Sequence, residues 1–371
     1  MLSDILQQIQ TKNTTEKMER MIEMENNKAL KSLKDVEEYK IDREKRKLFS
    51  ANHDDILSGA TTDIYFLRTL DILNHMGVAD REVTAEIFAR KKGIFAGIEE
   101  VKNILKDKNI EMWALEEGTE FEPKETLVRI KGPYKEFAIY ESVILGCLAS
   151  PCGWATAASE VKEACGDKPF VCFGTRHLHP SVAPVMERAA RLGGASSVSN
   201  ILTAKLLGEE PTGTLPHASF LVAGDTLEVA KVYNEIMPED HKRIVLVDTF
   251  KDEIEESLRL AEELGRNLYG IRLDTPSERG GVTPELVKEL RARLDLNGYT
   301  WVKIFVSGGL KPEKIKILSE VGVDAFGVGS YISGAPAIDM TMDIKEVDGK
   351  PVAKRGRIPG IVENDKLVKM L

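Results

Sequence analysis

The second half of the chain alternates short apolar runs with segments of helical spacing, and this alternation restricts the fold more than any other feature of the sequence. Strands that alternate with helices form parallel sheets, and parallel strands that are buried on both faces are apolar throughout, as these runs are. The predicted strands are the runs at 170–174, 195–199, 213–215, 244–248, 269–274, 303–309 and 325–330.

The helices between these runs have recognisable beginnings. Thr283-Pro284-Glu285 combines an N-cap residue, a proline at the first helical position and an acidic first turn, and Pro312-Glu313 opens a second helix. No Gly-x-Gly-x-x-Gly motif follows the first strand, as it would in a dinucleotide-binding sheet. We therefore predict an α/β fold with a closed or nearly closed parallel barrel over 168–334.

The first half of the chain is of the α+β type. Turn residues separate alternating apolar residues over 116–133, which predicts antiparallel hairpins, and a helix with many small residues follows over about 134–164. The tail over 335–371 reads as a hairpin that returns to this domain. We predict an α/β sandwich domain over 51–167, completed by 335–371.

Residues 1–50 form a charged N-terminal extension with apolar residues at helical spacing, namely Met18, Met21, Ile22, Leu30 and Leu33. This pattern predicts one or two exposed helices that are suited to an oligomer contact.

Composition excludes several classes of function. Lys and Arg number 51 against 60 Asp and Glu, a formal charge of −9, which disfavours a nucleic-acid partner because such binding depends on phosphate neutralisation. No run approaches the ~18 apolar residues of a membrane span, and the polar start does not resemble a signal peptide. The four cysteines form no Cys-x-x-Cys pair. We expect a cytoplasmic protein with buried, reduced thiols, no membrane contact and no structural zinc.

Polar residues follow each predicted strand, and in parallel α/β barrels the carboxyl ends of the strands converge on one ligand site. Two of these ends are rich in glycine, which lets backbone N–H groups approach a phosphate, although glycine after a strand also serves tight turns. The candidate residues are Arg176, Ser199, Asn200, His217, Asp248, Arg272, Asp274, Ser307, Gly308, Gly309, Gly329 and Ser330.

The charged members of this set point to particular chemistry. Arg176 offers a fork for a second phosphate group, although a single Arg is more often a surface ion-pair partner. Asp248 and Asp274 suit Mg²⁺ or ribose hydroxyls, and Asp248 alternatively suits an N-cap. Arg272 lies two residues before Asp274, so both point to one face of their strand. A charge pair inside a barrel is costly unless it serves a ligand or a network, which makes this pair the best catalytic candidate.

Eight short strings occur in order between about residues 57 and 356. They are Ser58-Gly-Ala-Thr-Thr-Asp-Ile-Tyr-Phe, Phe173-Gly-Thr-Arg-His-Leu-His-Pro, Gly193-Gly-Ala-Ser-Ser-Val-Ser-Asn, Gly213-Thr-Leu-Pro-His, Val247-Asp-Thr, Ile271-Arg-Leu-Asp-Thr-Pro, Val306-Ser-Gly-Gly-Leu and Gly327-Val-Gly-Ser. With these strings the chain resembles the nicotinate phosphoribosyltransferases of the type II phosphoribosyltransferase family, which also contains quinolinate phosphoribosyltransferase.

The resemblance implies an α/β sandwich domain joined to an irregular α/β barrel. It implies transfer of the phosphoribosyl group of phosphoribosyl pyrophosphate (PRPP) to nicotinate with Mg²⁺, which gives nicotinate mononucleotide and pyrophosphate for salvage into NAD. Most nicotinate enzymes of the family couple this step to ATP hydrolysis through a phosphorylated histidine in a Gly-Thr-x-x-His motif, which His217 matches.

The same resemblance assigns roles to single residues. Arg272 would bind the nicotinate carboxylate, and Tyr65 would stack on the pyridine ring of a neighbouring subunit, since family active sites lie at the subunit interfaces of homo-oligomers. Arg176 and Asp274 would serve the pyrophosphate and its Mg²⁺. The remaining PRPP contacts would come from Ser199, Asn200, Asp248 and Ser307, and the 5′-phosphate would lie on Gly308, Gly309, Gly329 and Ser330.

The chain departs from the family at three places. His177 stands where many relatives have a second Arg, and Pro216 precedes His217 where the commoner form has Ala. The Cys-rich, metal-binding tail of some archaeal relatives has no counterpart here, so the resemblance also predicts no structural zinc.

Three alternatives stay open on the residues alone. Quinolinate phosphoribosyltransferase would need a more basic pocket for two substrate carboxylates. A lyase or aldolase would need an inward lysine for a Schiff base, for which Lys303 is the one candidate. A nucleotide sensor without catalysis would keep the glycine-rich ends but would not need Arg272, Asp274 and His217 together.

Overall fold

The computed structural model describes residues 29–43 and 46–371 of the chain. The predicted helical positions Met18, Met21 and Ile22 lie outside these residues. Within the described part of the extension there is one helix, α2 (Leu33–Glu38), capped by the Ser32 side chain.

Two compact units make up the described chain. The first ends at Ala149 and resumes with Ile338–Leu371, and the second is Ser150–Ala337. The division therefore falls inside helix α7 (Glu141–Cys165), whereas the sequence placed it at 167/168. The helix is continuous, but its later turns pack into the second unit. A Cβ on Gly153 would lie 2.2 Å from the carbonyl oxygen of Pro336, so this contact requires the small residue.

The helical segment Tyr134–Cys165 was not expected to resemble a membrane span, yet it is long and apolar enough to cross a membrane by length and composition alone. In the structure 56% of its most apolar window is buried within the protein, and such a helix is weak evidence for a span.

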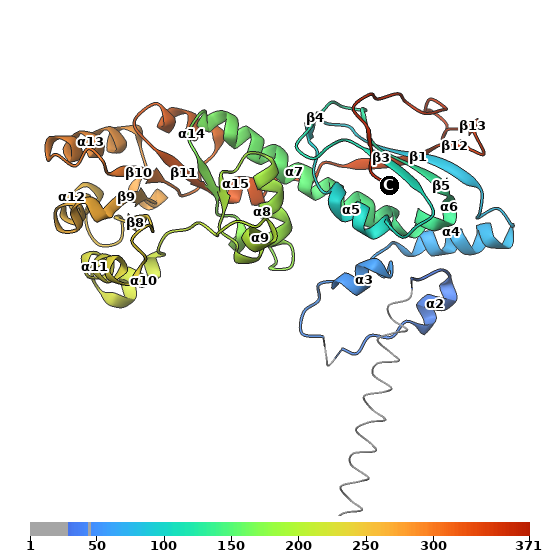
Figure 1. The fold of residues 1–371 in the computed structure, drawn as a ribbon, viewed down its shortest axis with the longest axis horizontal. Coiled ribbons are helices and arrows are strands. Elements are labelled where there is room, and N and C mark those ends of the chain that lie inside the picture. Colours follow the sequence, from blue (N-terminus) through green and yellow to red (C-terminus); the bar gives the residue numbers. More distant parts are fainter. Residues whose placement is uncertain (1–28, 44–45) are drawn as a thin grey trace, which may run out of the picture. The chain divides into compact units, whose positions relative to one another are not determined.

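The first unit is built on a six-stranded antiparallel sheet in the order β13–β12–β1–β5–β3–β14, with helices α4, α5 and α6 along one side (Figure 1). The tail covers the other face, where Val362 donates its N–H to Glu86 and the Arg357 guanidinium lies over the Phe88 ring. The predicted sandwich is confirmed. Its further elements are α3 (His53–Leu57), α4 (Ile64–His75), β1 (Glu82–Ala89), β2 (Gly93–Ile94), α5 (Ile98–Leu105), β3 (Glu111–Ala114), β4 (Glu120–Phe121), β5 (Thr126–Pro133), α6 (Tyr134–Phe137), β12 (Met340–Val347), β13 (Lys350–Pro351) and β14 (Val368–Lys369).

The predicted return of the tail is also confirmed. β12 pairs with β1 along its whole length and then turns into β13 through Asp348 and Gly349, both of which have positive φ. Such a turn matches the twist of a two-residue hairpin.

The second unit is a six-stranded, wholly parallel sheet in the order β7–β6–β11–β10–β9–β8, curled into an irregular half-barrel with helices around it (Figure 1). The α/β fold is confirmed, with β7 and β8 as the two edges of the sheet. Its elements are β6 (Phe170–Cys172), α8 (Ala183–Leu192), β7 (Ser197–Val198), α9 (Ile201–Leu206), α10 (His217–Ala223), α11 (Thr226–Ile236), β8 (Arg243–Leu246), α12 (Glu253–Leu264), β9 (Leu268–Leu273), α13 (Pro284–Leu296), β10 (Lys303–Val306), α14 (Pro312–Ser319), β11 (Ala325–Val328) and α15 (Ser330–Ser333).

The strand predicted at 213–215 is wrong, and the sheet ends at β7 and β8 without closing. Residues 211–216 form neither helix nor strand. Pro211 and Pro216 have no N–H to donate, and the segment is joined to β7 by the N–H of Thr212, which lies 2.9 Å from the carbonyl of Val198.

The sequence signals for helix starts, in contrast to that strand prediction, agree with the structure. Thr283 caps α13 through its side chain with Pro284 at the first turn, and Pro312 begins α14. Cys152, Cys165 and Cys172 are buried and Cys147 is partly buried, and these described cysteines form no disulfide.

Candidate active site

A pocket of about 570 Å³ lies at the carboxyl ends of the parallel strands, wholly within the second unit. Most of the residues that follow the predicted strands contribute to its wall, so the pocket lies where the sequence predicted a ligand site. The candidate residues that line it are Arg176, Ser199, Arg272, Asp274, Ser307, Gly308, Gly309, Gly329 and Ser330, together with Phe173, Thr175, His177, Ile201, Gly327 and the segment 211–216.

Arg272 projects from β9 into this pocket, two residues before Asp274, as the alternation of the strand predicted. Its guanidinium donates to the hydroxyl of Thr214 and more weakly to Asp274, at 3.5 Å, and it lies 5.8 Å from the centre of the Phe173 ring. Its Nε has no hydrogen-bond partner among the described residues. Burial lowers the pKa of Arg272. This guanidinium therefore retains donor capacity for a ligand.

Asp274 contacts side chains from three segments of the chain. Its Oδ1 accepts from the Ser307 hydroxyl at 3.0 Å, and its Oδ2 lies 3.5 Å from both Arg272 and Nε2 of His217. Gly308 has φ +91° and a Cβ there would lie 2.8 Å from Oδ1 of Asp274, so glycine is required for this approach.

His217 stands between two carboxylates. It is the first residue of α10, its Nδ1 contacts the Thr249 hydroxyl at 3.1 Å, and its Nε2 lies 3.7 Å from Asp248 and 3.5 Å from Asp274. Asp248 does not cap the following helix, because Asp252 does so. Neither His217 nor Asp248 belongs to the pocket wall, but His217 contacts Asp274 in that wall and Asp248 lies 3.7 Å from the same imidazole nitrogen.

Asp248 is the most unusual polar group of this cluster. Its side chain is 2% exposed, and neither carboxylate oxygen has a hydrogen-bond partner within the described chain. Burial raises the pKa of Asp248, while the nearby His217 opposes that shift. A buried carboxylate without donors fits a cation, either a protonated imidazole or a metal.

Asp248 and Asp274 suit a Mg²⁺ site that substrate phosphates complete. The described residues contain no group of three or more His, Cys, Asp or Glu that could hold a metal by themselves. Mg²⁺ is commonly held by one or two carboxylates together with substrate phosphates, and the unpartnered oxygens of Asp248 beside Asp274 suit that arrangement.

Glu187 is a residue of this site that sequence reasoning missed. It lies on α8, is fully buried, and accepts four hydrogen bonds. Oε1 accepts from the hydroxyls of Thr175 and Ser199, and Oε2 accepts from the backbone N–H groups of Ser199 and Asn200. It thereby joins the two loops that present Arg176 and Ser199 to the pocket. The available signal was its place among Ala183, Met186 and Ala190 on the buried face of α8.

Three residues that the sequence singled out have other surroundings. Asn200 caps α9 through its side chain, which accepts from the N–H of Thr203 at 3.0 Å, and it does not line the pocket. Tyr65 belongs to the first unit, near the start of α4, and its ring is 53% exposed. Lys303, the candidate for Schiff-base chemistry, begins β10 and pairs with Asp324 at 3.0 Å outside the pocket wall.

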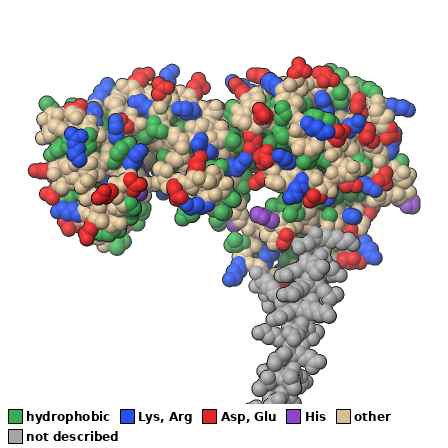
Figure 2. Space-filling model, viewed as in Figure 1, with side chains coloured by type: hydrophobic (Ala, Val, Ile, Leu, Met, Phe, Trp, Pro, Cys, Tyr) green, Lys and Arg blue, Asp and Glu red, His purple; other side chains and the backbone are tan. Residues whose placement is uncertain are grey.

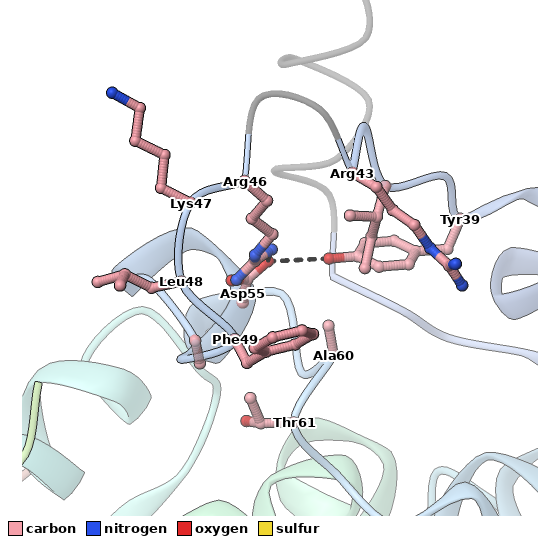
Figure 3. A pocket seen from close by; sticks show the side chains of 11 residues that line it. Tyr39, Arg43, Arg46, Lys47, Leu48, Phe49, Asp55, Ala60 and Thr61 are labelled. Atoms are coloured by element: carbon pink, nitrogen blue, oxygen red, sulfur yellow. Dashed lines mark hydrogen bonds and ion pairs between the residues drawn. The ribbon is translucent and has the colours of Figure 1, made fainter. Parts of the chain in front are cut away.

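A second hollow lies in the first unit, between Tyr39 and Thr61 (Figure 3). Its central carboxylate, Asp55, is already paired with Arg46 and accepts from the Tyr39 hydroxyl, and Lys47 and Leu48 point away from the hollow (Figure 3). The Arg46 guanidinium lowers the pKa of Asp55 to about 2. Because its carboxylate is already paired with Arg46, this hollow offers less for a ligand than the pocket of the second unit.

The fold and the pocket together define a class: a two-unit α/β protein with a small-molecule site at the carboxyl edge of a curled parallel sheet. Acidic and basic side chains are interspersed over the visible face of each unit (Figure 2). Two family models match consecutive parts of the chain, the quinolinate phosphoribosyl transferase N-terminal domain over 63–152 and the C-terminal domain over 154–343. The chain belongs to the quinolinate phosphoribosyl transferase family, whose members are type II phosphoribosyltransferases.

Individual relatives carry two different names. A nicotinate phosphoribosyltransferase of Mycobacterium tuberculosis is 34% identical over 251 residues, which are 64% of this chain and 52% of the relative, so the chain spans about half of that protein's length. The crystal structure of nicotinate-nucleotide pyrophosphorylase from Pyrococcus furiosus is 44% identical with a TM-score of 0.82, over 85% of this chain and 82% of that one. A probable nicotinate-nucleotide pyrophosphorylase [carboxylating] of Archaeoglobus fulgidus is 26% identical over 72% of this chain and 96% of its own.

Proposed function

We propose that the protein transfers the phosphoribosyl group of PRPP to nicotinate, giving nicotinate mononucleotide and pyrophosphate, as a step of salvage into NAD. The observation that carries this proposal is the small number of cations in the pocket. Among the described residues, the pocket wall contains two Lys or Arg side chains, those of Arg176 and Arg272. One carboxylate and one pyrophosphate suit two guanidinium groups, because each pairs well with a planar or multidentate anion.

The chemistry needs positioning and charge stabilisation rather than a base. The bond between C1 of the ribose and the pyrophosphate oxygen breaks, and the ring nitrogen of nicotinate forms the new bond to C1 with its own lone pair. Negative charge develops on the pyrophosphate, where Arg176, whose guanidinium has no partner among the described residues, is available to stabilise it. Arg272 holds the pyridine carboxylate and so orients the ring nitrogen.

Asp248 and Asp274 would hold the metal. When bound, Mg²⁺ would neutralise charge on the pyrophosphate leaving group. Asp274 keeps its orientation through Ser307, and the approach allowed by Gly308 brings the glycine-rich turn beside it. The backbone N–H groups of Gly309, Gly329 and Ser330 would bind the 5′-phosphate.

Coupling to ATP would use His217. In that step Nε2 attacks the γ-phosphorus of ATP, the bond to the ADP oxygen breaks, and water later cleaves the N–P bond to release phosphate. Thr249 at Nδ1 fixes the orientation of the ring, and Nε2 faces the carboxylates of Asp248 and Asp274.

We also propose a homo-oligomer in which Tyr65 serves a neighbouring subunit. Two apolar surfaces support this. In the first unit α4 exposes Ile64, Tyr65 and Ile72, and in the second unit α9, whose Ile201 borders the pocket, exposes Ile201, Leu202 and Leu206. Apolar stripes of this kind on separate helices are typical of interaction surfaces. Light scattering at micromolar concentration tests the assembly, and a monomer would contradict it.

Decarboxylating use of quinolinate is the second candidate, because the family models and the P. furiosus structure carry quinolinate or pyrophosphorylase names. Quinolinate has a second carboxylate beside the ring nitrogen, and it would require a further cation in the pocket.

A product-resolved assay separates the two candidates. The full chain is given PRPP and Mg²⁺ with either nicotinate or quinolinate, each with and without ATP. Nicotinate mononucleotide from nicotinate, without CO₂ release from quinolinate, supports the proposal, and a faster or more complete reaction with ATP supports the role of His217. Product from quinolinate with equimolar CO₂ would favour the second candidate, and product from neither would contradict both.

A further inference from the structure

The ring of His177 has a defined orientation at the pocket wall. Its Nδ1 lies 2.9 Å from the hydroxyl of Ser333, which is buried, and that hydroxyl donates to the backbone carbonyl of Gly329 at 3.1 Å. A serine hydroxyl has one proton, which here goes to the carbonyl, so it accepts from the imidazole. The proton of the neutral ring is therefore on Nδ1, and Nε2 carries the lone pair.

Protonation at Nε2 changes what His177 offers to an anion. The neutral ring presents a lone pair, which repels phosphate oxygens, whereas the protonated ring presents an N–H donor and a positive charge. Arg176 is the charged neighbour of the ring, and no described carboxylate forms an ion pair with it. Burial, and secondarily Arg176, lowers the pKa of His177, which favours the neutral ring.

A bound anion reverses this preference. Arg176 and His177 are consecutive residues of one 3₁₀ turn, Thr175–His177, and both line the pocket, so a phosphate group held by Arg176 lies close to the imidazole. Negative charge there favours the protonated ring, and the two events are linked.

We propose that His177 is a binding residue for a phosphate group of PRPP or pyrophosphate, that this contact requires a proton on Nε2, and that the pocket therefore takes up a proton when it binds the anion. The identity of the anion rests on the proposed function. Affinity falls as pH rises, by at most about tenfold per pH unit for one linked proton.

Calorimetry with inorganic pyrophosphate and Mg²⁺ tests this without turnover. Titrations of the full chain in buffers of different ionisation enthalpy give the number of protons taken up. We expect several tenths of a proton more for the wild type than for H177Q near neutral pH, and the comparison cancels the protons of pyrophosphate itself. H177R should bind tightly without the linkage. H179Q is the matched control, because His179 lies two residues away outside the pocket wall.

Equal proton uptake by the wild type and H177Q would overturn the inference, and so would loss of the linkage in H179Q. If pyrophosphate binds with the expected linkage but neither nicotinate nor quinolinate reacts, the proposed function fails and His177 keeps its role. If pyrophosphate does not bind at all, both fail.

Discussion

Each unit of the molecule holds an arginine against a carboxylate of its sheet, and the two pairs differ in how completely their hydrogen bonds are made. In the first unit Arg129 contacts Glu86 at 2.8 Å and donates to the carbonyl of Val362, while Glu86, 2% exposed, also accepts from the N–H of Val362. That network is complete. In the second unit Arg272 is 3.5 Å from Asp274, its Nε has no hydrogen-bond partner within the described chain, and neither oxygen of the neighbouring Asp248 has one there.

This is the difference that we expect between a pair that stabilises the fold and a pair that binds a ligand. Buried polar groups in folded proteins are nearly always hydrogen-bonded, so a network that closes on itself stabilises the fold. A network that is open at the wall of a pocket retains capacity that a ligand can use.

The largest expected effect is on Arg272. R272Q removes the charge that faces the nicotinate carboxylate, so kcat/KM for nicotinate should fall about 100- to 1000-fold, or about 3–4 kcal/mol, because an unpaired carboxylate is left in the site. The KM for PRPP should change much less. Steady-state kinetics with each substrate varied in turn measure this, and an equal loss for both substrates would contradict the assignment.

Removal of Arg129 should do the opposite. R129M leaves Glu86 buried without its guanidinium partner, which should lower the free energy of unfolding by about 3 kcal/mol. The activity of the folded fraction should stay near that of the wild type. Urea denaturation gives the stability, and a variant that is stable but inactive would show that the complete pair is not merely structural.

We expect Glu187 to contribute both to the stability of the fold and to the binding of PRPP. E187M removes both carboxylate oxygens and with them four hydrogen bonds, so we expect a loss of at least about 2 kcal/mol of stability. Because the loops of Arg176 and Ser199 are no longer held together, the KM for PRPP should rise about tenfold. Thermal denaturation and PRPP kinetics check the two effects, and a lower stability with an unchanged KM would limit Glu187 to the fold.

The smallest effect is expected at Asp55. Its pKa in the folded protein is about 2, below the ordinary value, so its pairing with Arg46 stabilises the fold above pH about 4 and this contribution is lost as pH falls toward 2. D55N should cost about 1 kcal/mol at neutral pH, since water screens the partly exposed Arg46. The stability of D55N should also fall less steeply between pH 4 and 2 than that of the wild type. Parallel acid-unfolding curves would contradict this.

The sequence predicted the parallel sheet and the position of the pocket because each depends on a local pattern: an apolar run, a helix start, and a polar residue where the run ends. The face shared by Arg272 and Asp274 followed from the alternation of one strand.

What the sequence missed depends on contacts between distant segments. The run at 213–215 has the composition of a strand, but the prolines on both sides of it each remove one backbone donor. The unit boundary inside α7 lies beside Pro151, but the helix continues through that proline, so no break in secondary structure marks the boundary. The side chain of Asn200 serves its own helix, and Glu187 is recognisable only once α8 is packed against the sheet.

The most direct test measures formation of nicotinate mononucleotide per folded molecule, for the wild type, R272Q and R129M in one assay with PRPP, Mg²⁺ and nicotinate. The account predicts turnover by the wild type, near-normal turnover by R129M and a loss of at least about 100-fold in R272Q. Equal activity of the two variants, or product from none of the three proteins, would contradict it.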